Sequence, residues 1–137
     1  MVDHDLDEDY RCRMCNEVAT KVTLNNIGAL SGFTNDANNP FSIDEEGVIK
    51  TGDGQQTIST MNLVADRTMV ISLQCRIEGG TSSDRWYFYL NGSIQTTFVG
   101  SSSQTNTFQI VLNEGDTLRI RYRRDSGTGF IQNFYIL

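Results

Sequence analysis

Residue types that favour helices or disulfide frameworks are scarce in this chain. Of its 137 residues only four are alanine and two are lysine, both good helix formers, whereas Ser, Thr, Asn and Gln together supply 43. This balance favours strands and turns over helices. The three cysteines, an odd number, argue against a disulfide framework and indicate a reducing compartment.

Histidine and long apolar runs are scarce as well. The sole histidine is His4, in an acidic segment, and histidine is the side chain most often used for acid–base and nucleophilic catalysis at neutral pH. We therefore predict a protein that is not an enzyme and has no catalytic residues. No apolar run approaches the length of a membrane span, and the first residues, MVDHDLDEDY, lack the positive start and apolar centre of a secretory signal. We therefore expect no membrane partner, and we expect the protein to be made in the cytosol.

Negative charge is concentrated at the amino terminus. The formal net charge is −6, and the first 17 residues hold six acids against two bases. An acidic chain repels phosphate backbones, so no nucleic-acid partner is expected. Residues 1 to about 18 lack alternation and are heavily charged, so residues 1–20 are predicted to form an extended arm, followed by one domain over residues 21–137.

Two patterns in the arm imitate metal sites but are incomplete. Cys12 and Cys15 have the spacing of half a zinc site, yet only His4 and the distant Cys75 could add further ligands. The alternating aspartates from Asp3 to Asp9 lack the glycine and closing glutamate of a calcium loop. We expect neither a metal nor another cofactor.

Period-two alternation of apolar residues predicts strands along most of the remaining chain. The clearest lie at 68–77, 85–90, 93–99, 108–112, 118–122 and 130–137, and weaker candidates at 19–24, 41–44, 48–51 and 56–63. Asn91-Gly92 predicts a hairpin between the strands on either side of it. The segment 108–122, FQIVLNEGDTLRIRY, likewise predicts a tight antiparallel hairpin. A count of about eight or nine short strands is typical of a sandwich or barrel.

Two sets of side chains are predicted to lie opposite the core face of their strands. The first is the row Arg119, Arg121 and Arg123, which could bind an acidic surface or pair across strands with carboxylates such as Glu78. The second is a candidate trimer interface made by tyrosines, for which a second core layer is the alternative. Its members are Tyr87, Tyr89 and Tyr135.

The order of elements resembles a known class of small domains. A strand ending in WYFYLNG, a return strand, the segment FQIVLNEGDTLRIRY and an aromatic carboxyl-terminal strand resemble the jelly roll of complement-type and tumour-necrosis-factor-type globular heads, over residues 42–137. The resemblance implies an all-β, antiparallel jelly-roll β-sandwich of about eight strands and a homotrimer. Bacteriophages use similar sandwiches as capsid cement (decoration) proteins and as tips of tail fibres or spikes.

The leading hypothesis is a trimeric cement protein that stabilises the outer capsid surface of a virion assembled in the host cytoplasm. Its arm would contact the major capsid protein through Asp3, Asp5, Asp7, Tyr10, Arg11 and Arg13. The alternative is a receptor- or carbohydrate-binding head that recognises a host surface glycan. Trp86 and the loops near Asn35, Ser82 and Ser101 are its candidate contacts. A third hypothesis is a cytosolic scaffold or ligand-binding barrel unrelated to viruses.

Overall fold

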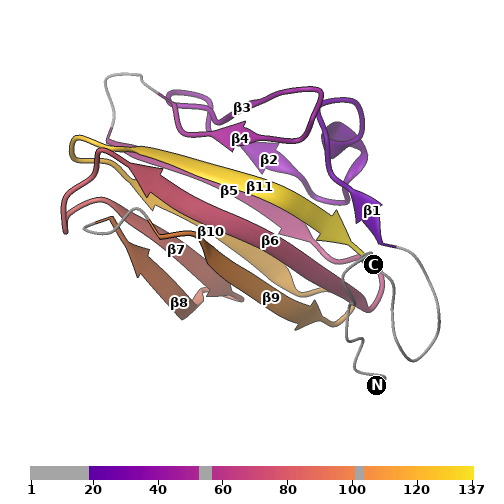
Figure 1. Cartoon of the computed structure of the whole chain (residues 1–137). Coiled ribbons are helices and arrows are strands. Elements are labelled where there is room, and N and C mark those ends of the chain that lie inside the picture. Colours follow the sequence, from indigo (N-terminus) through magenta and orange to yellow (C-terminus); the bar gives the residue numbers. More distant parts are fainter. Residues whose placement is uncertain (1–18, 53–56, 101–103) are drawn as a thin grey trace.

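The computed structural model describes residues 19–52, 57–100 and 104–137, which form a sandwich of two antiparallel sheets (Figure 1). The first sheet has the order β3-β4-β11-β6-β9, and β1 also pairs with β11. Its strands are β1 (Thr20–Lys21), β3 (Ser42–Ile43), β4 (Ile49–Lys50), β6 (Met69–Glu78), β9 (Asn106–Leu112) and β11 (Thr128–Ile136).

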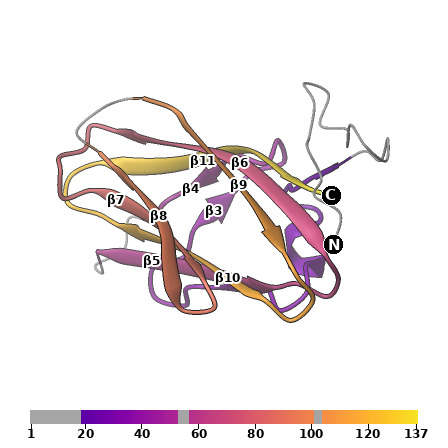
Figure 2. The same ribbon diagram turned by 90° about the horizontal axis from the view of Figure 1, so that it is seen from below.

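The second sheet has the order β2-β5-β10-β7-β8. Its strands are β2 (Thr34–Asn35), β5 (Ile58–Val64), β7 (Arg85–Leu90), β8 (Ser93–Val99) and β10 (Thr117–Arg123). In Figure 2 the layer with β10 and β5 lies apart from the layer with β11 and β6. Within the described ranges the helical structure is one short 3-10 turn, Ile27–Ala29, and no helix there is long and apolar enough to cross a bilayer.

These observations confirm the predicted all-β, antiparallel jelly-roll sandwich. Each predicted strand has a counterpart, although four of the eleven strands in the described ranges, β1 to β4, are only two residues long. The two-residue strand β2 was not predicted. The arm residues named above lie outside the described residues.

The predicted hairpin at Asn91-Gly92 is confirmed. Strands β7 and β8 pair in antiparallel register, from Leu90↔Ser93 at the turn to Arg85↔Val99 at the far end. Asn91 and Gly92 have φ values of 49° and 85°. Two consecutive positive φ values match the twist of the strands that the turn connects, and Asn and Gly are the residues that tolerate them.

The predicted hairpin over residues 108–122 is wrong. Strand β9 pairs with β6 in the first sheet, while β10 lies between β5 and β7 in the second. The turn at 113–116 therefore crosses from one sheet to the other. It is held by Ala65, which directly follows β5: the Ala65 N–H donates to Asp116 O (2.9 Å), and the Gly115 N–H donates to Ala65 O (2.8 Å). The predicted turn at 113–116 is confirmed. The hairpin is wrong because such a turn can join strands of one sheet or of two sheets.

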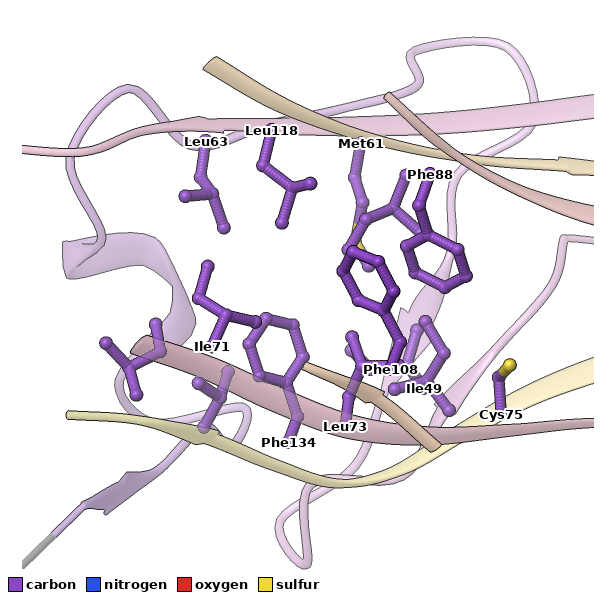
Figure 3. Close-up of a cluster of buried hydrophobic side chains, with 14 of the residues drawn as sticks. Ile49, Met61, Leu63, Ile71, Leu73, Cys75, Phe88, Phe108, Leu118 and Phe134 are labelled. Atoms are coloured by element: carbon purple, nitrogen blue, oxygen red, sulfur yellow. The ribbon is translucent and has the colours of Figure 1, made fainter. Parts of the chain in front are cut away.

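The apolar core fills the space between the sheets. In Figure 3, Met61, Leu63, Leu118 and Phe88 project from one layer toward Ile71, Leu73 and Phe134 of the other. The rings of Phe88 and Phe108 stack across the core with centroids 4.3 Å apart. Cys75 is fully buried on the core side of β6, which confirms that it packs as a small core residue.

Candidate functional site

The outer surface of the second sheet collects both residue sets singled out in the sequence. On β10, Leu118, Ile120 and Tyr122 are buried, so the alternate residues point away from the core. The same alternation on β7 and β5 buries Trp86, Phe88, Met61 and Leu63. We call the outward residues of these three strands the arginine–tyrosine face. They are Ile58, Thr60, Asn62, Val64, Arg85, Tyr87, Tyr89, Thr117, Arg119, Arg121 and Arg123.

Strand register sets the neighbours on this face. Arg119 lies opposite Tyr89, Arg121 opposite Tyr87, and Arg123 opposite Arg85. The rings of Tyr87 and Tyr89 stack with centroids 6.2 Å apart and an interplanar angle of 27°. Two tyrosines and four arginines thus occupy adjacent positions on two paired strands.

A shallow hollow of about 340 Å³ lies on the arginine–tyrosine face. It is lined by Thr57, Ile58, Tyr87, Tyr89, Arg121 and Arg123. Tyr87, Tyr89 and Arg121 are partly exposed, and Arg123 is exposed. The hollow therefore offers two aromatic rings and two guanidinium groups to a ligand that comes from solvent.

The guanidinium groups of this face have no carboxylate partner among the described residues. The salt bridges in that part of the chain are Arg67–Asp66 (3.1 Å) and Arg76–Glu78, both elsewhere. The alternative that Glu78 pairs with the arginine row is therefore wrong: Glu78 lies on β6, in the other sheet. On the face itself, the Arg119 Nε–H donates to Asn62 Oδ1 (3.1 Å).

The three predicted interface tyrosines do not form one surface. Tyr135 is on β11, opposite Ser72, and lies between the buried residues Phe134 and Ile136. It therefore faces outward from the first sheet, on the opposite side of the sandwich from Tyr87 and Tyr89. The predicted interface tyrosines are therefore divided between two opposite faces of one protomer.

Trp86 is not available for ring stacking with a ligand. Its side chain is 0% exposed, and its ring contacts Tyr122 and Phe41 with centroids 4.9 and 5.7 Å away. The indole N–H donates to Arg76 O at 3.3 Å. The sequence already carried this signal, because Trp86 shares its strand face with the core residue Phe88.

One of the proposed loop contacts is engaged within the fold. The Asn35 side chain accepts from the Phe41 N–H (3.0 Å) and donates to Phe41 O (2.9 Å), so it holds its own loop together. The backbone carbonyl of Ser82 accepts a long hydrogen bond from the Arg85 Nε–H (3.3 Å), and the Ser82 residue is exposed. Ser101 lies outside the described residues.

Asp84 is a buried acid that sequence reasoning did not find. It is 0% exposed, and its carboxylate joins the loop before β7 to the loop between β10 and β11. Oδ1 accepts from the Tyr122 O–H (3.0 Å) and from the Asp125 and Gly127 N–H groups (both 2.9 Å). Oδ2 accepts from the Thr81 N–H (2.8 Å) and, at 3.3 Å, from the Ser126 N–H.

These hydrogen bonds make Asp84 a structural residue. Burial alone would raise the pKa of Asp84, but the backbone N–H groups that point at its carboxylate lower that pKa to about 2. The group is therefore ionised and fully engaged at neutral pH, so it has no free lone pair with which to activate a substrate. In the described ranges no group of three His, Cys, Asp or Glu residues is placed to hold a metal ion.

No protein-family model matches this chain, and no curated protein matches it in sequence. The secreted serine protease VesC from Vibrio cholerae matches 87% of the chain at 11% identity, with a TM-score of 0.66. The arabinose-bound α-L-arabinofuranosidase MgGH51 matches 80% at 11% identity, with a TM-score of 0.52. This chain covers only 28% and 23% of those two chains. A CBM22-1 xylan-binding domain from Paenibacillus barcinonensis matches 77% at 14% identity, with a TM-score of 0.45. At these identities the first two similarities establish a shared fold and nothing further.

Proposed function

We propose that this protein is a non-enzymatic binding module that binds carbohydrate on its arginine–tyrosine face. The observation that carries the proposal is the partly exposed pair of stacked rings, Tyr87 and Tyr89, beside guanidinium groups that have no carboxylate partner in the described structure. Aromatic rings pack against the apolar C–H face of a sugar, and guanidinium N–H groups donate to its oxygens. Thr60 and Asn62 add a hydroxyl and an amide on the neighbouring strand β5.

The position of the apolar residues also favours a hydrophilic ligand. The core of a typical protein interface is more apolar than its rim. Here the two central strands present arginine and tyrosine, whereas the exposed apolar residues Ile94 and Val99 lie on the edge strand β8. A ligand seated at the centre of this face would contact mostly polar groups and ring faces.

A glycan array tests the proposal, with the unmodified protein compared with two tyrosine variants. We expect Tyr87→Ala to abolish binding, because the stacking surface is lost, and Tyr87→Phe to retain most of it, because the ring remains. Tyr135→Ala is the matched control: it removes a partly exposed strand tyrosine from the opposite outer face. Absence of any glycan ligand, or equal binding by Tyr87→Ala, would refute the proposal.

The cement role is the second candidate function. The observation that favours it is composition, because arginine and tyrosine are among the residue types enriched at protein interfaces. The hypothesis assigns capsid contacts to residues 1–18 and to the arginine row. Capsids stripped of this protein should then bind the full chain but not a chain lacking residues 1–18. Undiminished binding by the truncated chain would disprove the arm hypothesis.

A further inference from the structure

We infer that the ligand of the arginine–tyrosine face is an acidic glycan whose carboxylates pair with Arg121 and Arg123; this inference rests on the proposed function. It begins from the charge of the second sheet. None of its five strands contains an aspartate or glutamate, although the whole chain has a net charge of −6. Four of the nine arginines nevertheless point outward from two adjacent strands of this sheet.

The register adds a second observation. Arg85 and Arg123 are direct partners across strands β7 and β10. Side chains in such positions have Cβ atoms about 5 Å apart, and like charges placed there destabilise the sheet. Among the described residues neither arginine of this pair forms a salt bridge with a carboxylate. A bound anion would remove the repulsion, so the free protein bears a small folding cost that ligand binding relieves.

The spacing of the guanidinium groups suits a chain of acidic sugars. Arg121 and Arg123 are two residues apart on one strand, so their Cα atoms are roughly 7 Å apart and both side chains point outward. Each planar guanidinium can form two parallel hydrogen bonds to one planar carboxylate. Tyr87, opposite Arg121, would place its ring beside the sugar that carries this carboxylate.

Nucleic acid fits these observations less well than an acidic glycan. Proteins that bind nucleic acid present an extended basic surface that neutralises many phosphates. This face offers four arginines, and the two carboxylates proposed here require only Arg121 and Arg123.

The inference is tested by binding to three acidic polymers: polygalacturonate, alginate and hyaluronan. Each polymer is compared with the neutral product made by reducing its carboxyl groups. Isothermal titration calorimetry would measure the affinities in 50 mM and in 500 mM NaCl. We expect at least one acidic polymer to bind about 10- to 100-fold more tightly than its neutral product, as for loss of a charge-assisted hydrogen bond. We expect the higher salt to weaken that binding.

Arginine variants assign the effect to particular side chains. Arg121→Gln and Arg123→Gln should each weaken binding to the acidic polymer about 10-fold or more, yet leave binding to the neutral one unchanged. Arg67→Gln is the control, because Arg67 is exposed, pairs with Asp66 and lies between β5 and β6. Thermal unfolding adds an independent readout: Arg123→Gln should keep or raise the Tm at low salt, because it relieves the repulsion from Arg85.

The outcomes separate the inference from the proposed function. Equal affinity for acidic and neutral polymers would overturn the inference and leave carbohydrate binding intact. Binding of dextran sulfate or of DNA alone, without any carboxylated glycan, would also overturn it. Failure to bind any glycan would refute the inference and the proposed function together.

Discussion

Replacement of Asp84 by asparagine is the sharpest test of how the loops beside the sandwich are held. Asp84→Asn keeps the shape of the side chain but turns one acceptor oxygen into an NH₂ donor. The less damaging orientation places this NH₂ at the Oδ2 position. In the unmodified protein, Oδ2 accepts from the Thr81 N–H (2.8 Å) and the Ser126 N–H (3.3 Å), so in the variant these two donors would face the NH₂ group. Two partly buried backbone donors would then lack an acceptor.

The magnitude follows from those two donors. A buried donor left without a partner costs roughly 1–3 kcal/mol. Both donors are partly buried, and the 3.3 Å bond from Ser126 is the weaker one, so each cost lies near the lower end of that range. The hydrogen bonds that remain at Oδ1, from Tyr122, Asp125 and Gly127, lose the charge that strengthens them. We therefore expect the free energy of unfolding to fall by about 2–4 kcal/mol at pH 7.

The effect should depend on pH in a defined direction. The pKa of Asp84 is lowered from 3.8 to about 2 in the folded protein. This carboxylate therefore stabilises the fold above pH 3.8, and the stabilisation is lost as the pH falls through 2. The shift corresponds to about 2 kcal/mol. Because asparagine does not titrate, the difference between the two proteins should shrink by about that amount between pH 7 and pH 2.

Urea unfolding at pH 7 and at several pH values down to 2 measures both quantities. Asp125→Asn is the matched control in the same cluster: its exposed carboxylate accepts a hydrogen bond from the Thr81 hydroxyl (2.8 Å), so its loss should cost less than about 1 kcal/mol. A loss below about 1 kcal/mol for Asp84→Asn, or a difference that does not change with pH, would refute the structural role assigned to Asp84.

Three further predictions concern the core. Tyr122→Phe should lower the free energy of unfolding by about 1.5 kcal/mol, because it removes a buried hydrogen bond to the Asp84 carboxylate; chemical denaturation that shows no loss would contradict this. In a variant with Cys12 and Cys15 replaced by serine, Cys75 should not react with a thiol reagent at pH 8 while the protein is folded, because burial raises the pKa of Cys75 to about 12. Reaction in the absence of denaturant would show that Cys75 is not buried in the core. Gly129→Ala should lower the free energy of unfolding by about 2 kcal/mol, because the new Cβ would lie 2.6 Å from Tyr122 Cε2 and 2.8 Å from Trp86 Cζ2. Gly28→Ala is the control, because its Cβ would have no neighbour within 4 Å, and equal melting temperatures for the two variants would show that the core rearranges to accommodate the Gly129→Ala methyl group.

The strands were predictable because their signals are local. Strands β7 and β8 have the bounds expected from alternation and from Asn91-Gly92, whose positive φ values define the turn without reference to distant residues. The same kind of signal failed for the turn at 113–116. Alternation places Leu112 and Leu118 in the core whether their strands pair within one sheet or face each other across two, so it does not distinguish these arrangements.

The candidate site was predictable only in its parts. Alternation placed Arg121 outward on one strand and Tyr87 outward on another, but nothing in the sequence showed that these two residues are cross-strand partners. Asp84 gave no signal at all, because its partners Asp125 and Gly127 are 41 and 43 residues away. A polar loop residue gains such a role only when two loops are brought together.

Local sequence was enough to predict most strands, the turn at Asn91-Gly92, the core side of β6, β7, β9 and β10, and the outward row of arginines. These depend on backbone dihedral preferences and on the two-residue period of the pleat, which act over a few neighbouring residues. Three features emerge only when distant strands and loops come together: β9 and β10 belong to different sheets, Asp84 is buried, and arginines and tyrosines share a face. Strand order and register depend on the free energy of the whole core, to which residues far apart in the chain contribute together.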